Sequence, residues 1–202
     1  MQFSEYRFLV LSDLYRITGV TNKCVDVIRF IFFGESFRYV FWMRTCLYTR
    51  SNRLLKFTIY PLARVLLRRL EYKLGISIPP NTKIGSGFYI GHFGGIVVNE
   101  NSVIGKNCNI SHGVTLGQVN RGTKKGSPQL ADNIYIGPGA KIIGAVRIGN
   151  NAAIGANCVV TKDVPDNAVV IGVPGKVISY EGSKTYVNRT EYEDDNPRSS
   201  VL

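Results

Sequence analysis

Residues 130–160 read LADNIYIGPGAKIIGAVRIGNNAAIGANCVV, and an apolar residue returns at every sixth position of this stretch. The same period extends from Ile78 to about Val164, through Ile78, Ile84, Ile90, Val98, Ile104, Ile110, Leu116, Leu130, Ile136, Ile142, Ile148, Ile154 and Val160. A period of six fits neither an α-helix nor an ordinary amphipathic strand, and a sustained hexapeptide period indicates a parallel β-helix. We therefore predict a mainly β fold with one short strand per hexad and three hexads per triangular coil.

The repeats divide the chain into three parts. Residues 1–75 read as helices, residues 76–178 as the β-helix, and the polar residues 179–202 as a loosely ordered tail. Two extra residues follow His92, and residues 118–129 interrupt the repeat as a protruding loop. Because binding loops commonly stand on rigid scaffolds, we interpret this loop as an arm that helps to wall an active site.

Composition narrows the classes of function. The net charge is +11, and residues 1–75 hold 13 Lys and Arg against 5 Asp and Glu, a balance of +8. No nucleic-acid-binding motif accompanies this charge, so we predict no nucleic acid partner. No signal peptide is evident, and no run reaches the roughly 18 uncharged apolar residues of a spanning helix, so we predict a cytoplasmic location.

The helical region has two interpretations that are compatible with each other. It can be a cap packed on the β-helix or on a neighbouring subunit. Alternatively, arginines interleaved with Phe, Tyr and Trp over residues 37–44 suit peripheral contact with the inner face of the membrane. Cys108 and Cys158 occupy small inward positions of hexads, so packing is their expected role.

The chain has two histidines, and both stand two positions after the apolar residue of a hexad. His92 and His112 are 20 residues apart, which is one coil plus the two extra residues. Neighbouring strands lie about 4.8 Å apart, so the two imidazoles should share one face of adjacent coils. Neighbouring imidazoles resist joint protonation, and a neutral imidazole can take a proton from a hydroxyl. No third metal ligand is evident nearby, so we predict no metal site.

The hexads resemble those of the left-handed β-helix acyltransferases, and residues 90–98, IGHFGGIVV, are most similar to the serine acetyltransferase branch and its polysaccharide-modifying relatives. The resemblance implies a left-handed coil, a homotrimer and acetyl-CoA as acetyl donor. It implies that His92 is the general base for direct attack on the thioester, and that His112 either orients His92 or binds the acceptor. Glu100 matches a glutamate of that branch, as a lesser catalytic candidate. By motif match, acetyl-CoA would contact Gly137, Pro138, Ala156, Thr161, Lys162 and Lys176.

Three positions depart from the serine enzymes. Those enzymes carry aspartate, aspartate and histidine where this chain has Gly91, Ser77 and Ser127. The resemblance implies that the groups at positions 91 and 127 pair with the amino-acid acceptor and that the aspartate at position 77 orients the base. Without the two acceptor-pairing groups, we predict a neutral saccharide acceptor of capsule, exopolysaccharide or O-antigen, with a lipid-linked glycan suited to residues 1–75. Ser127 and Arg121 of the loop are predicted to contact this acceptor.

Three alternatives stay open. Serine O-acetylation is one, and a non-catalytic β-helix scaffold is another. A metal enzyme similar to the gamma-class carbonic anhydrases would need three histidines per site, which two histidines on one face do not provide.

Overall fold

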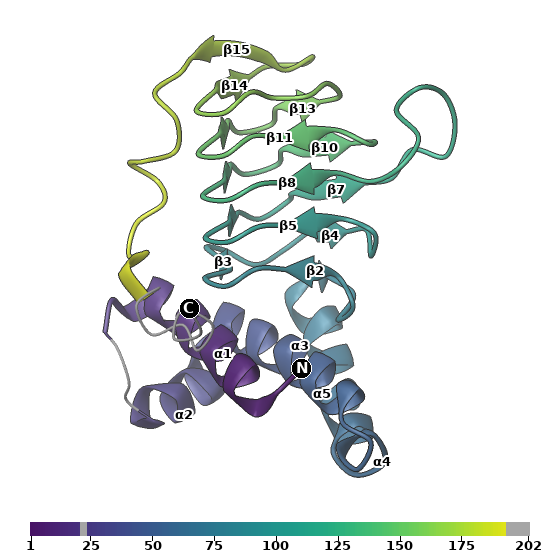
Figure 1. Cartoon of the computed structure of the whole chain (residues 1–202), viewed down its shortest axis with the longest axis vertical. Coiled ribbons are helices and arrows are strands. Elements are labelled where there is room, and N and C mark those ends of the chain that lie inside the picture. Colours follow the sequence, from purple (N-terminus) through teal and green to yellow (C-terminus); the bar gives the residue numbers. More distant parts are fainter. Residues whose placement is uncertain (21–23, 193–202) are drawn as a thin grey trace, which may run out of the picture.

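A computed structural model describes residues 1–20 and 24–192, and Figure 1 shows a prism of short strands standing on a layer of helices. The helices come first in the chain: α1 (Phe3–Thr18), α2 (Cys24–Phe33), α3 (Glu35–Ser51), α4 (Leu55–Thr58) and α5 (Tyr60–Leu74). Pro61 lies in the first turn of α5, where its missing N–H and fixed φ are tolerated.

Three sheets form the sides of the prism. The first contains β1 (Ile76–Ser77), β4 (Ile96–Val98), β7 (Thr115–Gly117), β10 (Lys141–Ile143) and β13 (Val159–Val160). The second contains β2 (Lys83–Ile84), β5 (Val103–Ile104), β8 (Gln129–Leu130) and β11 (Arg147–Ile148). The third contains β3 (Tyr89–Ile90), β6 (Asn109–Ile110), β9 (Tyr135–Ile136), β12 (Ala153–Ile154), β14 (Val169–Ile171) and β15 (Lys176–Ser179).

The hexad residues fill the interior of the prism in register. Ile90 pairs with Ile110, Ile110 with Ile136 and Ile136 with Ile154, all between parallel strands. Their side chains are buried, and Cys108 and Cys158 fill the small inward positions, as predicted. The predicted left-handed β-helix with an N-terminal helical region is therefore confirmed.

The helices cover the lower edge of the first coil, where strand N–H and C=O groups have no further strand to pair with. Arg44 donates to the carbonyl oxygens of Ile84 (2.7 Å) and Gly85 (2.6 Å), and Asp13 accepts from the N–H of Phe88 (2.7 Å). Arg44 and Asp13 also form a buried ion pair at 2.9 Å. Side chains of α1 and α3 thus replace the missing coil beneath β2 and β3.

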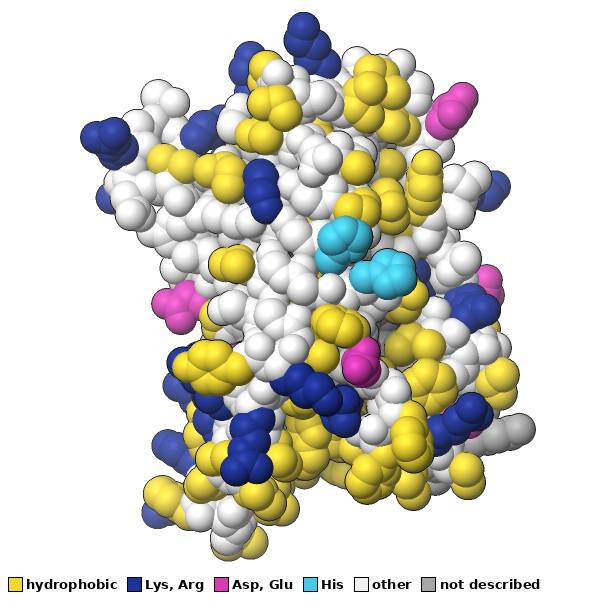
Figure 2. All heavy atoms as spheres, turned by 180° about the vertical axis from the view of Figure 1, so that it is seen from behind, with side chains coloured by type: hydrophobic (Ala, Val, Ile, Leu, Met, Phe, Trp, Pro, Cys, Tyr) yellow, Lys and Arg dark blue, Asp and Glu magenta, His cyan; other side chains and the backbone are white. Residues whose placement is uncertain are grey.

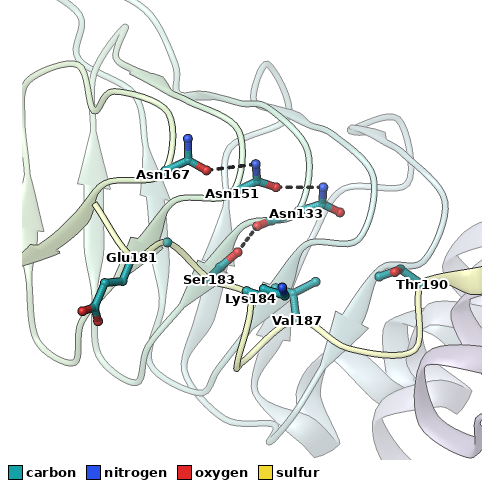
Figure 3. A pocket seen from close by; sticks show the side chains of 9 residues that line it. Asn133, Asn151, Asn167, Glu181, Ser183, Lys184, Val187 and Thr190 are labelled. Carbon is teal, nitrogen blue, oxygen red and sulfur yellow. Dashed lines mark hydrogen bonds between the residues drawn. The ribbon is translucent and has the colours of Figure 1, made fainter. Parts of the chain in front are cut away.

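One corner of the prism carries a ladder of asparagines. Asn133 donates to Asn151 (3.0 Å) and Asn151 donates to Asn167 (3.2 Å), as Figure 3 shows. Asn107 donates to Asn133 in the same way, at 3.0 Å. All four residues have positive φ, between 54° and 59°, a conformation that asparagine tolerates better than most residues. The ladder therefore satisfies the turns of successive coils with one repeated residue.

The predicted loosely ordered tail is wrong for residues 179–192. This segment descends along the asparagine corner and returns to α1 (Figures 1 and 3). Ser183 donates to the carbonyl of Asn133 (2.5 Å), Tyr186 stacks on Tyr135 with centroids 4.3 Å apart, and Arg16 donates to the carbonyl of Asn188 (2.7 Å). The polar composition serves these contacts with the prism. Residues 193–202 of the predicted tail lie outside the described residues.

Candidate active site

The two histidines stand at the corner where the third sheet turns into the first. His92 follows β3 and His112 follows β6, and these strands pair through Tyr89 with Asn109 and Ile90 with Ile110. Before the histidines Ile90 pairs with Ile110, 20 residues further on, whereas after them Val97 pairs with Thr115, 18 residues further on. The two extra residues predicted from the sequence therefore widen this corner directly after His92.

The two imidazoles lie side by side. Their ring centroids are 6.1 Å apart and their planes meet at 70°, an edge-to-face arrangement. Both side chains are exposed, and Figure 2 shows them as the adjacent cyan groups on one face of the prism. The predicted pairing of His92 and His112 on one face is thus what the structure contains. An exposed imidazole beside a second one can exchange a proton with a bound hydroxyl.

Lys141 supports the turn that follows His112, and the sequence analysis missed it. Its half-buried ammonium group donates to the carbonyl of Gly113 and to the hydroxyl of Thr115 (3.2 Å). The sequence could have indicated this position, because Lys141 directly precedes the inward Ile142. The pairing of β7 with β10 places Lys141 opposite Thr115. Strand alternation and register together would have placed this lysine on the outer face, beside the histidine corner.

The residues predicted to contact acetyl-CoA divide into two groups within one chain. Gly137, Pro138 and Ala156 continue the histidine corner upward, because β9 and β12 extend the register of β3 and β6. Lys176 on β15 stands opposite Ile171, at the upper end of that same corner. Thr161 and Lys162 follow β13 instead, and they lie at the corner where the first sheet turns into the second.

Glu100 and the loop also lie at the corner between the first and second sheets. Glu100 follows β4, whereas His92 precedes it. Glu100 lines a pocket of about 270 Å³ with Asn81, Lys83 and residues 101–103. The structure therefore does not bring Glu100 to the histidines of its own chain. The loop stands away from the prism at the end of β7 (Figure 1), with Arg121 exposed and Ser127 buried at its base.

The loop is anchored at its base. Val119 and Gly126 form an antiparallel bridge, and Lys124 pairs with Asp163 at 2.9 Å. The N–H of Arg147 and then Lys124 hold the pKa of the Asp163 carboxyl below its usual value. Ser127 is buried and its hydroxyl donates to Asn99 (2.9 Å), so within one chain this hydroxyl serves the corner after β4.

The side chains of Cys46, Cys108 and Cys158 are free and buried. Burial raises the pKa of the Cys108 thiol to about 12 and that of Cys46 to about 11, so both stay protonated and unreactive. In residues 1–20 and 24–192, no three His, Cys, Asp or Glu side chains gather as a metal site.

Known proteins share this architecture. Residues 127–162 match the family described as bacterial transferase hexapeptide (six repeats). The solved serine acetyltransferase of Neisseria gonorrhoeae, in complex with serine, is 32% identical with a TM-score of 0.69, and the match covers 88% of this chain and 70% of that one. This chain belongs to the hexapeptide-repeat transferase family.

Further hexapeptide-repeat relatives carry the same name. A serine acetyltransferase of Bacillus pumilus is 39% identical over 139 residues, which are 69% of this chain and 63% of that protein. This chain thus spans less than two thirds of that relative's length. The serine acetyltransferase of Brucella abortus, solved with coenzyme A, has a TM-score of 0.70 at 28% identity, over 88% of this chain and 69% of that one.

These relatives contradict the saccharide acceptor predicted from the sequence, together with the capsule, exopolysaccharide, O-antigen and lipid-linked glycan variants of it. The relatives are named serine acetyltransferases, and one of them is solved with serine. The prediction was wrong because it rested on two missing charges, at Gly91 and Ser127. A missing charge weakens recognition of one acceptor but does not identify another.

Proposed function

We propose that this protein is an acetyl-CoA-dependent O-acetyltransferase whose acceptor is the hydroxyl group of L-serine. The observation that carries the proposal is the pair of exposed imidazoles, His92 and His112, 6.1 Å apart on a hexapeptide β-helix whose relatives are serine acetyltransferases. Acetyl-CoA as donor is supported by a coenzyme A complex among the similar structures.

In the proposed reaction His92 acts as the general base. Its neutral ring takes the proton of the serine hydroxyl while the oxygen forms a bond to the thioester carbonyl carbon. The tetrahedral intermediate then expels the thiolate of coenzyme A, which takes the proton back from the imidazolium. His112 lies where it can orient His92 or hold the acceptor. Lys141 fixes the turn after His112 through the Gly113 carbonyl.

A homotrimer is part of the proposal, because one chain divides the predicted site between two corners of the prism. The histidine corner is one of them, and the corner between the first and second sheets carries Thr161, Lys162, Glu100 and the loop with Arg121. A groove between two copies would bring these two different corners together. Arg121 is then a suitable partner for the serine carboxylate, since guanidinium and carboxylate pair in two parallel hydrogen bonds.

Recognition of serine should be weaker than in an enzyme that keeps the charged groups at these positions. Gly91 and Ser127 supply no charge to the ammonium or carboxylate groups of the amino acid. We therefore propose a high KM for serine with ordinary use of acetyl-CoA. Reduced, buried thiols at Cys46, Cys108 and Cys158 suit a cytoplasmic enzyme.

Release of coenzyme A, followed with a thiol reagent, tests the function. L-Serine should give saturable release, whereas L-alanine, which lacks the hydroxyl, should give only background hydrolysis. His92→Ala should lower kcat by about 10²–10⁴-fold, the usual contribution of a general base. Equal release with serine and alanine, or an unimpaired His92→Ala variant, would refute the proposal.

A further inference from the structure

Helix α2 is mostly apolar, and the described residues cover only one of its sides. Asp26 and Arg29 are its only charged residues. One side packs against a cluster that contains Val10, Leu14 and Phe37, through the residues Val27, Phe30 and Ile31. The other side is exposed and carries Val25, Ile28, Phe32 and Phe33, of which Phe33 is 83% exposed. The apolar side of a helix is normally buried against other residues, and the described residues leave this one uncovered.

A second group of exposed apolar side chains lies at the same end of the molecule. Figure 1 places α2 and α4 at the end of the molecule opposite β15. The segment around α4 and the start of α5 exposes large apolar side chains as well, namely Leu54, Phe57, Leu62 and Val65. Figure 2 shows hydrophobic side chains gathered along this end with Lys and Arg among them. We call these eight residues the basal surface.

Positive charge surrounds the basal surface. Exposed cations on or beside α2, α4 and α5 are Arg29, Arg53, Lys56, Arg68 and Arg69. Asp26 and Glu35 are the acidic residues on or directly after α2, and Glu71 of α5 is paired with Arg64 at 3.1 Å and with Arg68 at 2.9 Å. Residues 1–75 as a whole carry a formal balance of +8. The partner of this surface must therefore accept both apolar side chains and a strong positive field.

We propose that the basal surface docks on an anionic lipid membrane. Aromatic and aliphatic side chains ringed by Lys and Arg are what a helix lying in the membrane interface presents. A second copy of this chain fits less well, because a two-fold contact would bring like charge against like charge. No helix in residues 1–20 and 24–192 is long and apolar enough to cross a membrane, so the contact is peripheral.

Vesicle flotation with the full chain tests this surface. Wild-type protein should float with phosphatidylcholine vesicles that contain phosphatidylserine, remain below with phosphatidylcholine alone, and detach as salt is added. A double variant, Phe32→Ser with Phe33→Ser, should bind at least about tenfold more weakly, since two large apolar groups no longer enter the interface.

A matched double variant at the opposite end, Ile178→Ser with Tyr180→Ser, controls for loss of exposed apolar area. These side chains are 59% and 65% exposed, and the variant should bind vesicles like wild type. Far-UV circular dichroism and thermal unfolding establish that both variants are folded. Wild type that stays unbound overturns the proposal, as does equal binding by the two variants. Loss of self-association in Phe32→Ser/Phe33→Ser, with vesicle binding unchanged, would assign the surface to a second copy.

Discussion

Gly91 offers a direct test of why serine recognition should be weak. It immediately precedes His92, and the serine enzymes that this sequence resembles carry aspartate there. The structure has room for the side chain. Gly91 is not among the residues with positive φ, and a β-carbon built on it would lie 3.5 Å from Cε1 of Tyr89, an ordinary van der Waals distance. Gly91→Asp should therefore fold normally and place a carboxylate beside the base.

The expected gain follows from the pairing of that carboxylate with the serine ammonium group. A charge-assisted hydrogen bond contributes about 1.5–3 kcal/mol, and about 1.4 kcal/mol is a factor of ten. Gly91 is half-buried at a solvent-facing corner, so the lower end of the range applies. We expect the KM for L-serine to fall by about tenfold in the thiol-release assay, with the KM for acetyl-CoA unchanged.

Gly91→Asn is the matched control, because it has nearly the same size and no charge. It should leave the KM for serine close to that of wild type. An equal effect of Asp and Asn would mean that size, not charge, matters at this position. No effect of Asp, in a protein that still turns over serine, would refute the placement of the amino-acid ammonium beside His92.

Three further predictions concern the scaffold beneath and beside the site. Arg44→Met should destabilise the protein by about 3–5 kcal/mol, because it leaves the Asp13 carboxylate buried without its ion-pair partner. The double variant with Asp13→Asn should lose less stability than the sum of the two single variants. Urea unfolding, followed by the fluorescence of the single tryptophan, Trp42, measures these losses, and additive losses would contradict the prediction. Asn151→Ala should lower the free energy of unfolding by about 2–3 kcal/mol, because it removes the ladder hydrogen bonds and places alanine at a φ of 56°. Asn151→Gly should lower it by about 1 kcal/mol less, because glycine adopts this φ without strain. Equal losses on thermal unfolding would exclude a backbone contribution. Lys141→Met should lower kcat by about tenfold through the turn after His112, measured by thiol release, and an unchanged kcat would mean that backbone bonds alone hold that turn.

Much of the prism could be predicted from the sequence because its information is local. Each hexad names its own inward residue, so the alignment of Ile90 with Ile110, and hence of His92 with His112, follows from counting along the chain. The contacts that join distant segments carry no such period. Asp13 and Arg44 sit in helices whose local sequence does not reveal that Phe88 and Gly85 will be their partners.

The tail and Glu100 illustrate the same limit. Ser183 and Tyr186 look like parts of a polar tail until the asparagine corner supplies their partners. Glu100 matches a family position by sequence, yet it follows β4 whereas His92 precedes β4, so the two residues lie at different corners of the prism.

The amino-acid sequence by itself determined the β-helix, the helical region and the adjacency of the two imidazoles, because all three depend on period and composition. Only the tertiary structure decided which edge each predicted residue occupies, how α1 and α3 close the first coil, and that the basal surface is left uncovered. These features depend on which segments meet in space, and burial and hydrogen bonding between distant residues are properties of the folded chain alone.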